Sequence, residues 1–110
     1  LDNTVRAQRH NEDLFIPVTV LLELAWVRGA RDATRNEIIS ALRKIIALPR
    51  ARAQHAEAVR RALDWMDAGL DFADAFHLAL SERTDKFLSF DANLSRRAAR
   101  LGARPAVSAP

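Results

Sequence analysis

The sequence predicts an α/β fold in which helices cover a short, mostly parallel sheet. Short apolar runs alternate along the chain with longer segments of helical periodicity, and this alternation is typical of βαβ units. Most of the longer segments are bounded by residues that begin or end helices. Parallel sheets form sites at the carboxyl ends of their strands, so residues near a strand exit are the first candidates for function.

The first half of the chain predicts two strands and two helices. We expect a buried strand at 14–18, a helix at 19–27, a helix from 35 to about 48, and a weak edge strand at 50–54. Thr19 can cap the first helix, and Gly29 can end it. The second helix begins after Thr34, has an isoleucine-rich apolar face and ends before Pro49.

The second half continues the alternation. We expect helices at 56–68, 72–83 and 93–101, and strands at 86–90 and 105–107. Gly69 can end the first of these helices, and Asp71 or its neighbour begins the next. The inward face of that next helix is expected to consist of Phe72, Ala75, Phe76, Ala79 and Leu80. The strand at 86–90 ends at Asp91.

Composition favours one intracellular, soluble domain of residues 1–110. A chain of 110 residues can bury one core, and the absence of cysteine excludes disulfide scaffolds and thiolate zinc sites. No apolar run approaches the length of a membrane span and no signal peptide is found, so we expect a cytoplasmic protein. The net charge of +3 comes from a basic set that is almost all arginine, which suits phosphate contacts.

Four acidic residues lie inside or beside apolar runs: Glu23, Asp71, Asp74 and Asp91. Two carboxylates about 4 Å apart repel by roughly 4 kcal/mol at an effective dielectric constant of about 20. Converging carboxylates therefore need raised pKa values or a cation, and oxygen ligands favour Mg²⁺ or Mn²⁺. Such a cation can support phosphodiester hydrolysis. Each acid can equally be structural, with Asp71 and Asp91 as helix caps and Glu23 paired with Arg28.

Three segments in this order resemble PIN-domain ribonucleases of the VapC toxin type: ELAWV, DFADAFHLA and SFD. The resemblance covers about residues 14–107 and implies a three-layer α/β/α fold with a short parallel central sheet. It implies a metal-dependent endoribonuclease that acts as the toxin of a VapBC-like type II toxin–antitoxin system. RNA is then the substrate, a VapB-like antitoxin is the partner, and the protein is a homodimer.

The resemblance also assigns residues. It implies that the acids Glu23, Asp74 and Asp91 bind Mg²⁺ or Mn²⁺ and carry catalysis. Asp71 matches no required acid of the family, so we expect it to cap a helix or to support the site. The polar residues expected to support the metal or bind the substrate are Ser89, Asn93 and Arg96.

One part of the family pattern is missing from the sequence. The family opens with a central strand that ends in an Asp-Thr-Asn motif, whose Asp is the first metal ligand. Here Asp2 follows no apolar strand and lies too close to Glu23 for the long helical segment of the family. We expect a truncation or an internal deletion. The alternative hypotheses are a catalytically defective remnant that binds antitoxin without cleaving RNA, and a PIN-like nuclease of RNA processing.

Other features have two interpretations each. His77 is expected to be a partly buried structural histidine rather than a ligand. Trp26 and Trp65 are expected in the core or at an interface rather than as base-stacking platforms. The arginines of the last helix can contact RNA phosphates or form a solvated face: Arg96, Arg97 and Arg100.

Overall fold

The structure, a computed structural model, describes residues 12–110. The possible first ligand Asp2 therefore lies outside the described residues. The chain divides into two compact units, one ending at Ala56 and the other covering Glu57–Pro110, each with its own helices and its own pair of strands. The expectation of one domain over residues 1–110 stays a prediction. Within the described residues, no helix is long and apolar enough to cross a membrane.

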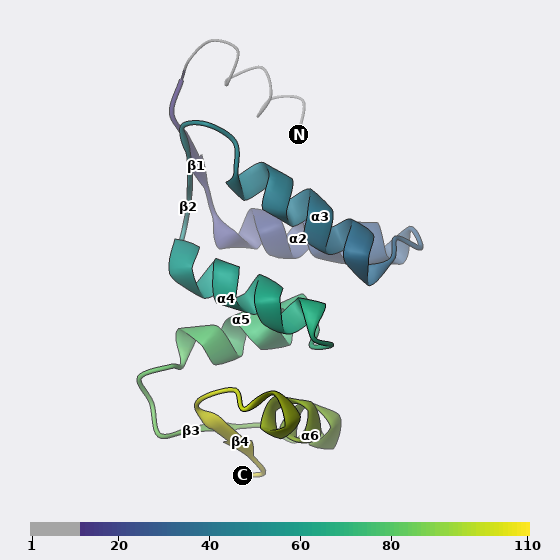
Figure 1. The fold of residues 1–110 in the computed structure, drawn as a ribbon, viewed down its shortest axis with the longest axis vertical. Coiled ribbons are helices and arrows are strands. Elements are labelled where there is room, and N and C mark those ends of the chain that lie inside the picture. Colours follow the sequence, from purple (N-terminus) through teal and green to yellow (C-terminus); the bar gives the residue numbers. More distant parts are fainter. Residues whose placement is uncertain (1–11) are drawn as a thin grey trace. The chain divides into compact units, whose positions relative to one another are not determined.

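Strands and helices alternate along the chain as predicted (Figure 1). The elements are β1 (Leu14–Ile16), α2 (Val18–Ala30), α3 (Arg35–Ile46), β2 (Ala51–Ala53), α4 (Ala56–Asp67), α5 (Phe72–Leu80), β3 (Lys86–Leu88), α6 (Ala92–Leu101) and β4 (Ala106–Ser108). Both strand pairs, β1 with β2 and β3 with β4, are parallel. The α/β class with short parallel pairing is confirmed. The described strands form two separate pairs rather than one sheet, because each has a hydrogen-bonded neighbour on one side only.

The strand pair of the first unit is held at both ends by further backbone hydrogen bonds. The Leu14 N–H donates to the Arg50 carbonyl at 3.0 Å, and the Gln54 N–H donates to the Ile16 carbonyl at 2.8 Å. The buried residues of this unit are Ile16, Leu21, Ile38, Ile39 and Leu42. Ile38, Ile39 and Leu42 of the predicted apolar face of α3 therefore lie in the core, whereas Ile45 and Ile46 of that face are only half-buried.

The predicted N-cap of α2 is wrong by two residues. Pro17, not Thr19, occupies the N-cap position, and its side chain offers no acceptor. The partly buried Val18 N–H donates instead to the side-chain oxygen of Gln54, which lies next to β2 and accepts it at 2.9 Å. A distant side chain thus replaces the local cap that the sequence suggested.

The turn between α2 and α3 also differs from the prediction. α2 continues through Gly29 to Ala30, and Asp32 adopts the left-handed conformation, with φ of 63°. α3 then begins with a reciprocal capping box, as its predicted start after Thr34 allows. The Glu37 N–H donates to Thr34 Oγ1 at 3.1 Å, and the Thr34 N–H donates to Glu37 Oε1 at 2.8 Å. Hydrogen bonds from the backbone and then the side chain of Thr34 to the Glu37 carboxylate hold the pKa of Glu37 below its ordinary value.

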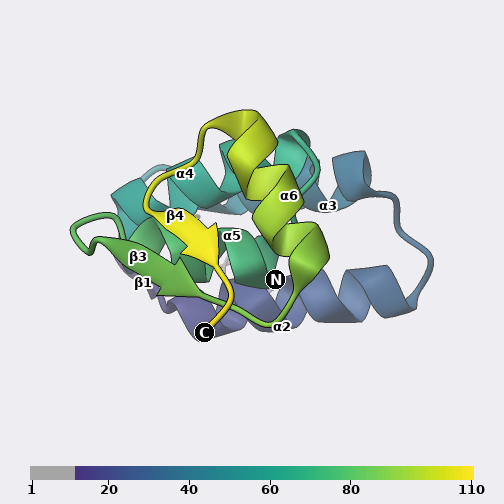
Figure 2. The same cartoon turned by 90° about the horizontal axis from the view of Figure 1, so that it is seen from below.

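The core of the second unit comes from one face of each of its three helices. Its fully buried side chains include Val59 and Leu63 of α4 and Leu78 of α5. Within α5 the rings of Phe72 and Phe76 stack with their centroids 6.2 Å apart. α6 packs along β4, which lies beside β3 (Figure 2). Each strand is only three residues long, so the pair depends on the helices packed against it.

Two turns set the positions of the acidic residues. Gly69 ends α4 as predicted, with φ of 122°, and the chain turns within a few residues into α5. β3 ends at Leu88 rather than at Phe90, because the chain bends at Phe90 before α6 begins. Asp71 therefore lies at the start of α5, and Asp91 lies at the start of α6.

Candidate functional site

The start of α5 holds two carboxylates on one helical face. Asp71 occupies the N-cap position, and Asp74 lies in the first turn, three residues later. The side chain of Asp71 makes no capping hydrogen bond, so the predicted cap is present by position only. Negative charge is favoured at a helix N-terminus by the helix dipole, which helps this turn to tolerate both acids.

The junction of β3 and α6 fixes Asp91. Its Oδ1 accepts hydrogen bonds from the backbone N–H groups of Asn93 at 2.9 Å and of Leu94 at 3.2 Å. Asp91 therefore caps α6, which was one of its two predicted interpretations. The Asp91 N–H donates to Ser89 Oγ at 3.0 Å, which fixes the backbone just before the helix. Both hydrogen bonds to the carboxylate fall on Oδ1, and among the described residues none is made to Oδ2.

The surroundings of Asp74 disfavour its negative charge. Partial burial raises the pKa of Asp74 above its ordinary value, and the charges of Asp71 and Asp91 raise it further. The nearby His77 acts in the opposite direction and is the smallest of these influences. The second unit therefore brings Asp71, Asp74 and Asp91 close enough for their charges to interact. A positive ion between them would relieve this repulsion.

Asp71 is the residue that sequence reasoning undervalued. The resemblance assigned Asp71 no required role, yet the charge of Asp71 raises the pKa of Asp74 more than the charge of Asp91 does. The signal was present in the sequence as the three-residue spacing of Asp71 and Asp74, which places them on one face if the helix begins between them. Asp91 could be joined to this pair only by the fold.

Glu23 lies exposed on α2, in the first unit. Its grouping with Asp74 and Asp91 stays a prediction. Among residues 12–110, no three His, Cys, Asp or Glu side chains are grouped so that they could hold a metal ion. The donor set of the second unit nevertheless fits a hard cation in its chemistry, since Asp74 and Asp91 supply carboxylate oxygens in a place where their charges repel.

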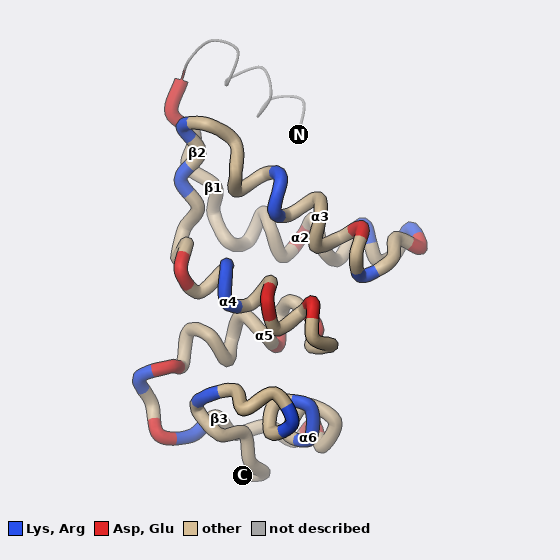
Figure 3. The backbone as a smooth tube through the Cα atoms, in the orientation of Figure 1, with Lys and Arg blue, Asp and Glu red and all other residues tan. Residues whose placement is uncertain are grey.

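The predicted substrate-binding residues lie around the Asp91 cap. Ser89 accepts the Asp91 N–H, and the Asn93 side-chain oxygen accepts from the guanidinium of Arg96. On the same helix Arg97 donates to the Gly69 carbonyl at 3.2 Å, so this arginine braces α6 against the turn that precedes α5. α6 carries the exposed residues Arg96, Arg97 and Arg100 and no acidic residue (Figure 3).

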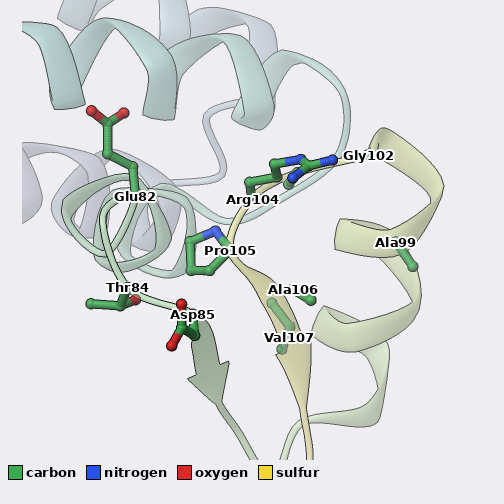
Figure 4. A pocket seen from close by; sticks show the side chains of 10 residues that line it. Glu82, Thr84, Asp85, Ala99, Gly102, Arg104, Pro105, Ala106 and Val107 are labelled. Atoms are coloured by element: carbon green, nitrogen blue, oxygen red, sulfur yellow. The ribbon is translucent and has the colours of Figure 1, made fainter.

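A cavity of about 590 Å³ opens elsewhere in the second unit (Figure 4). Its walls include Glu82, Thr84, Asp85, Arg104 and Pro105, which belong to the loops before β3 and β4. It therefore lies at the amino ends of the two strands, whereas Asp91 follows the carboxyl end of β3. Sites in parallel sheets form at the carboxyl ends of the strands, and no predicted site residue lines this cavity.

The fold and these acids define an α/β protein whose second unit concentrates carboxylates at one strand end. The family model of the PIN domain matches residues 2–100, which is most of the chain. The protein belongs to the PIN-domain family. PIN domains have a nuclease-like fold and are generally nucleases. No curated protein and no solved structure matches the chain.

Proposed function

We propose that the protein is a metal-dependent endoribonuclease that hydrolyses RNA phosphodiester bonds. The observation that supports this proposal is the environment of Asp74, where partial burial and two acidic neighbours raise the pKa of a carboxyl group. Perturbed carboxyl groups of this kind are frequent at functional sites. Membership of the PIN-domain family makes phosphodiester hydrolysis the reaction class to test first.

Asp74 and Asp91 are the proposed ligands of Mg²⁺ or Mn²⁺ in the second unit. The bound cation would supply a polarised phosphate and an activated water. The cap bonds on Oδ1 of Asp91 hold its carboxylate in one orientation, with Oδ2 as the donor to the cation. Asp71 adds negative charge that favours cation binding. Glu23 is proposed as a third ligand on the basis of the resemblance of its segment alone.

The other residues around Asp91 are proposed to position the RNA. Ser89 holds the backbone N–H of Asp91, and Asn93 holds the guanidinium of Arg96. An arginine fixed in this way presents its remaining N–H groups in a planar array that matches two oxygens of a phosphate. Asn93 and Arg96 would thus orient the phosphodiester bond relative to the acids.

We further propose that the protein is the toxin of a VapBC-like type II toxin–antitoxin system. The support is the order of the segments ELAWV, DFADAFHLA and SFD, which resembles toxins of the VapC type. The partners would be a VapB-like antitoxin and a second copy of the chain. The expected consequence is that expression of the protein alone inhibits growth and that co-expression of the antitoxin restores it.

Cleavage of RNA by the purified protein with and without Mn²⁺ or Mg²⁺ tests the proposal. Asp74→Asn and Asp91→Asn should each lower the rate by more than about 100-fold, since even residues that only support metal ligands typically contribute about 10- to 100-fold. Glu23→Gln tests the third ligand in the same assay. Asp85→Asn is the matched control, because Asp85 is an exposed acid that precedes β3 instead of following it.

The outcome that contradicts this proposal is equally specific. A folded protein that shows no metal-dependent cleavage but still binds its antitoxin in a pull-down would be a catalytically defective remnant. Unchanged cleavage by both Asp74→Asn and Asp91→Asn would remove these two acids from the mechanism. Loss of cleavage in Asp85→Asn as well would point to a general effect of charge.

A further inference from the structure

Phe90 is exposed at the place where the proposed chemistry occurs. It lies at the bend between β3 and α6, and 91% of its surface is accessible. A phenylalanine in this state forgoes the favourable free energy that its burial would give. The next residue is Asp91, whose Cα atom lies about 3.8 Å farther along the chain. The ring therefore stands one residue away from a proposed metal ligand.

The surface beside Phe90 is positively charged, as the binding of a nucleic acid requires. Asn93, Arg96 and Arg100 follow one another at helical spacing along the exposed side of α6. A rise of about 1.5 Å per residue makes this stripe roughly 10 Å long, starting next to the bend at Phe90. Arginines along such a stripe can contact successive phosphates of one strand.

We propose that Phe90 is a stacking platform for one nucleobase of the RNA substrate. The inference deepens the proposed function and rests on it. A base can stack on an aromatic ring only when it is not covered within a duplex, and such stacking tolerates any base because every base has a π face. The base on Phe90 places its own backbone beside Asp91, and the arginines of α6 hold the phosphates that follow.

Binding of fluorescein-labelled RNA, followed by anisotropy, tests the inference. The RNA is a short unstructured strand or the same strand in a duplex, and the protein carries Asp74→Asn so that the RNA stays intact. Phe90→Ala should weaken binding of the single strand on the order of tenfold. Phe90→Trp should retain it. Leu88→Ala is the matched control, since Leu88 is an apolar residue two positions before Phe90 that is 58% exposed.

A second measurement locates the base. Abasic sites are introduced at one position of the RNA at a time, and each RNA is bound to the Asp74→Asn protein with and without Phe90→Ala. At one position the abasic site and Phe90→Ala should each weaken binding by a similar factor, and together by no more than either alone. Such non-additivity is the mark of two groups that contact each other.

Three results would overturn the inference: single-stranded RNA bound equally well by Phe90→Ala, equal weakening in Phe90→Trp, or equal affinity for the duplex. If Phe90→Ala instead loses only binding of an antitoxin, the ring is a protein contact and the inference also fails. Its failure is distinguishable from that of the proposed function. Cleavage by the parent protein with unchanged binding in Phe90→Ala rejects the platform alone, whereas Phe90-dependent binding without any cleavage rejects the nuclease alone.

Discussion

The surroundings of Asp74 disfavour the ionised form of its carboxyl group. Partial burial, and then the charges of Asp71 and Asp91, raise its pKa above the ordinary value. The folded protein therefore binds this proton more tightly than the unfolded chain does. By linkage, the stability contributed at Asp74 is greatest below the unfolded pKa and decreases as the pH rises through the folded pKa.

Asp74→Asn should therefore raise the melting temperature near neutral pH, by up to about 5 °C, because the amide carries no charge to bury or to repel. Below the ordinary Asp value of 3.8 the carboxyl group becomes neutral in both states, and the gain should disappear. Thermal unfolding followed by circular dichroism on both sides of that pH measures the effect. Asp85→Asn controls for net charge, and a lower melting temperature in Asp74→Asn near neutral pH would contradict the argument.

Asp91 is proposed to have two roles, and two substitutions separate them. Asp91→Ala removes both the cap of α6 and the ligand, so the free energy of unfolding should fall by about 1 kcal/mol and cleavage should be lost. Asp91→Asn keeps an acceptor for the N–H groups of Asn93 and Leu94, so only cleavage should be lost. Urea denaturation and the cleavage assay measure the two effects. Equal destabilisation by Ala and Asn would show that the cap requires the negative charge.

Single residues were predicted well where the physical cause is local. A cap of α6 was one of the two interpretations of Asp91, and its side chain does cap that helix. Periodicity placed Leu80 inward, but Leu78 is fully buried whereas Leu80 is 47% exposed, because α5 ends at Leu80 and its last residue extends past the core. His77 is exposed rather than partly buried. Trp26 is 75% exposed, so the core is excluded as its position within the described structure, and its expected alternative, an interface, stays a prediction.

The two helices of the first unit begin in different ways. α3 begins with a capping box made by Thr34 and Glu37, three residues apart, and its start was predicted correctly. α2 begins at Val18 with the help of Gln54, which is far along the chain. Sequence reasoning chose the nearest hydroxyl, Thr19, since a partner so remote in sequence leaves no local signal.

Removal of the Gln54 acceptor tests the remote cap. Gln54→Leu should lower the free energy of unfolding by about 1 kcal/mol, because the Val18 N–H loses its partner in a partly buried place. Gln54→Glu retains an acceptor oxygen and is the matched control. Chemical denaturation of both variants gives the comparison. If the two variants unfold alike, the hydrogen bond contributes little to stability.

At the scale of the whole molecule, the α/β class and the parallel pairing followed from the alternation of apolar runs. The separation of the described strands into two pairs could not be predicted, because the pattern of apolar runs does not show which strands are neighbours. The grouping of Asp74 with Asp91 required the fold of the second unit for the same reason. Spacing along the chain gave each acid a position on its own element and nothing about its distance from the others.

The positive charge of the molecule gives RNA binding a predicted dependence on salt. For single strands, the logarithm of affinity falls with the logarithm of salt concentration by about 0.7 for each phosphate neutralised. Arg96→Gln and Arg100→Gln should each reduce the slope by about that amount. Binding titrations at several salt concentrations measure it. Arg60→Gln, on an exposed arginine of α4 that pairs with Glu57, should leave the slope unchanged.

The cap at the start of α6 restricts how an incoming anion can be received. The amide groups of Asn93 and Leu94, which would otherwise cradle a phosphate, already point at a carboxylate of their own chain. A phosphate could accept hydrogen bonds from these N–H groups only by displacing the Asp91 carboxylate. Anion capture is thereby left to guanidinium groups on long side chains, which adapt to many strand geometries. If the protein binds RNA as proposed, we expect discrimination among targets to come from the bases rather than from a rigid site for the backbone.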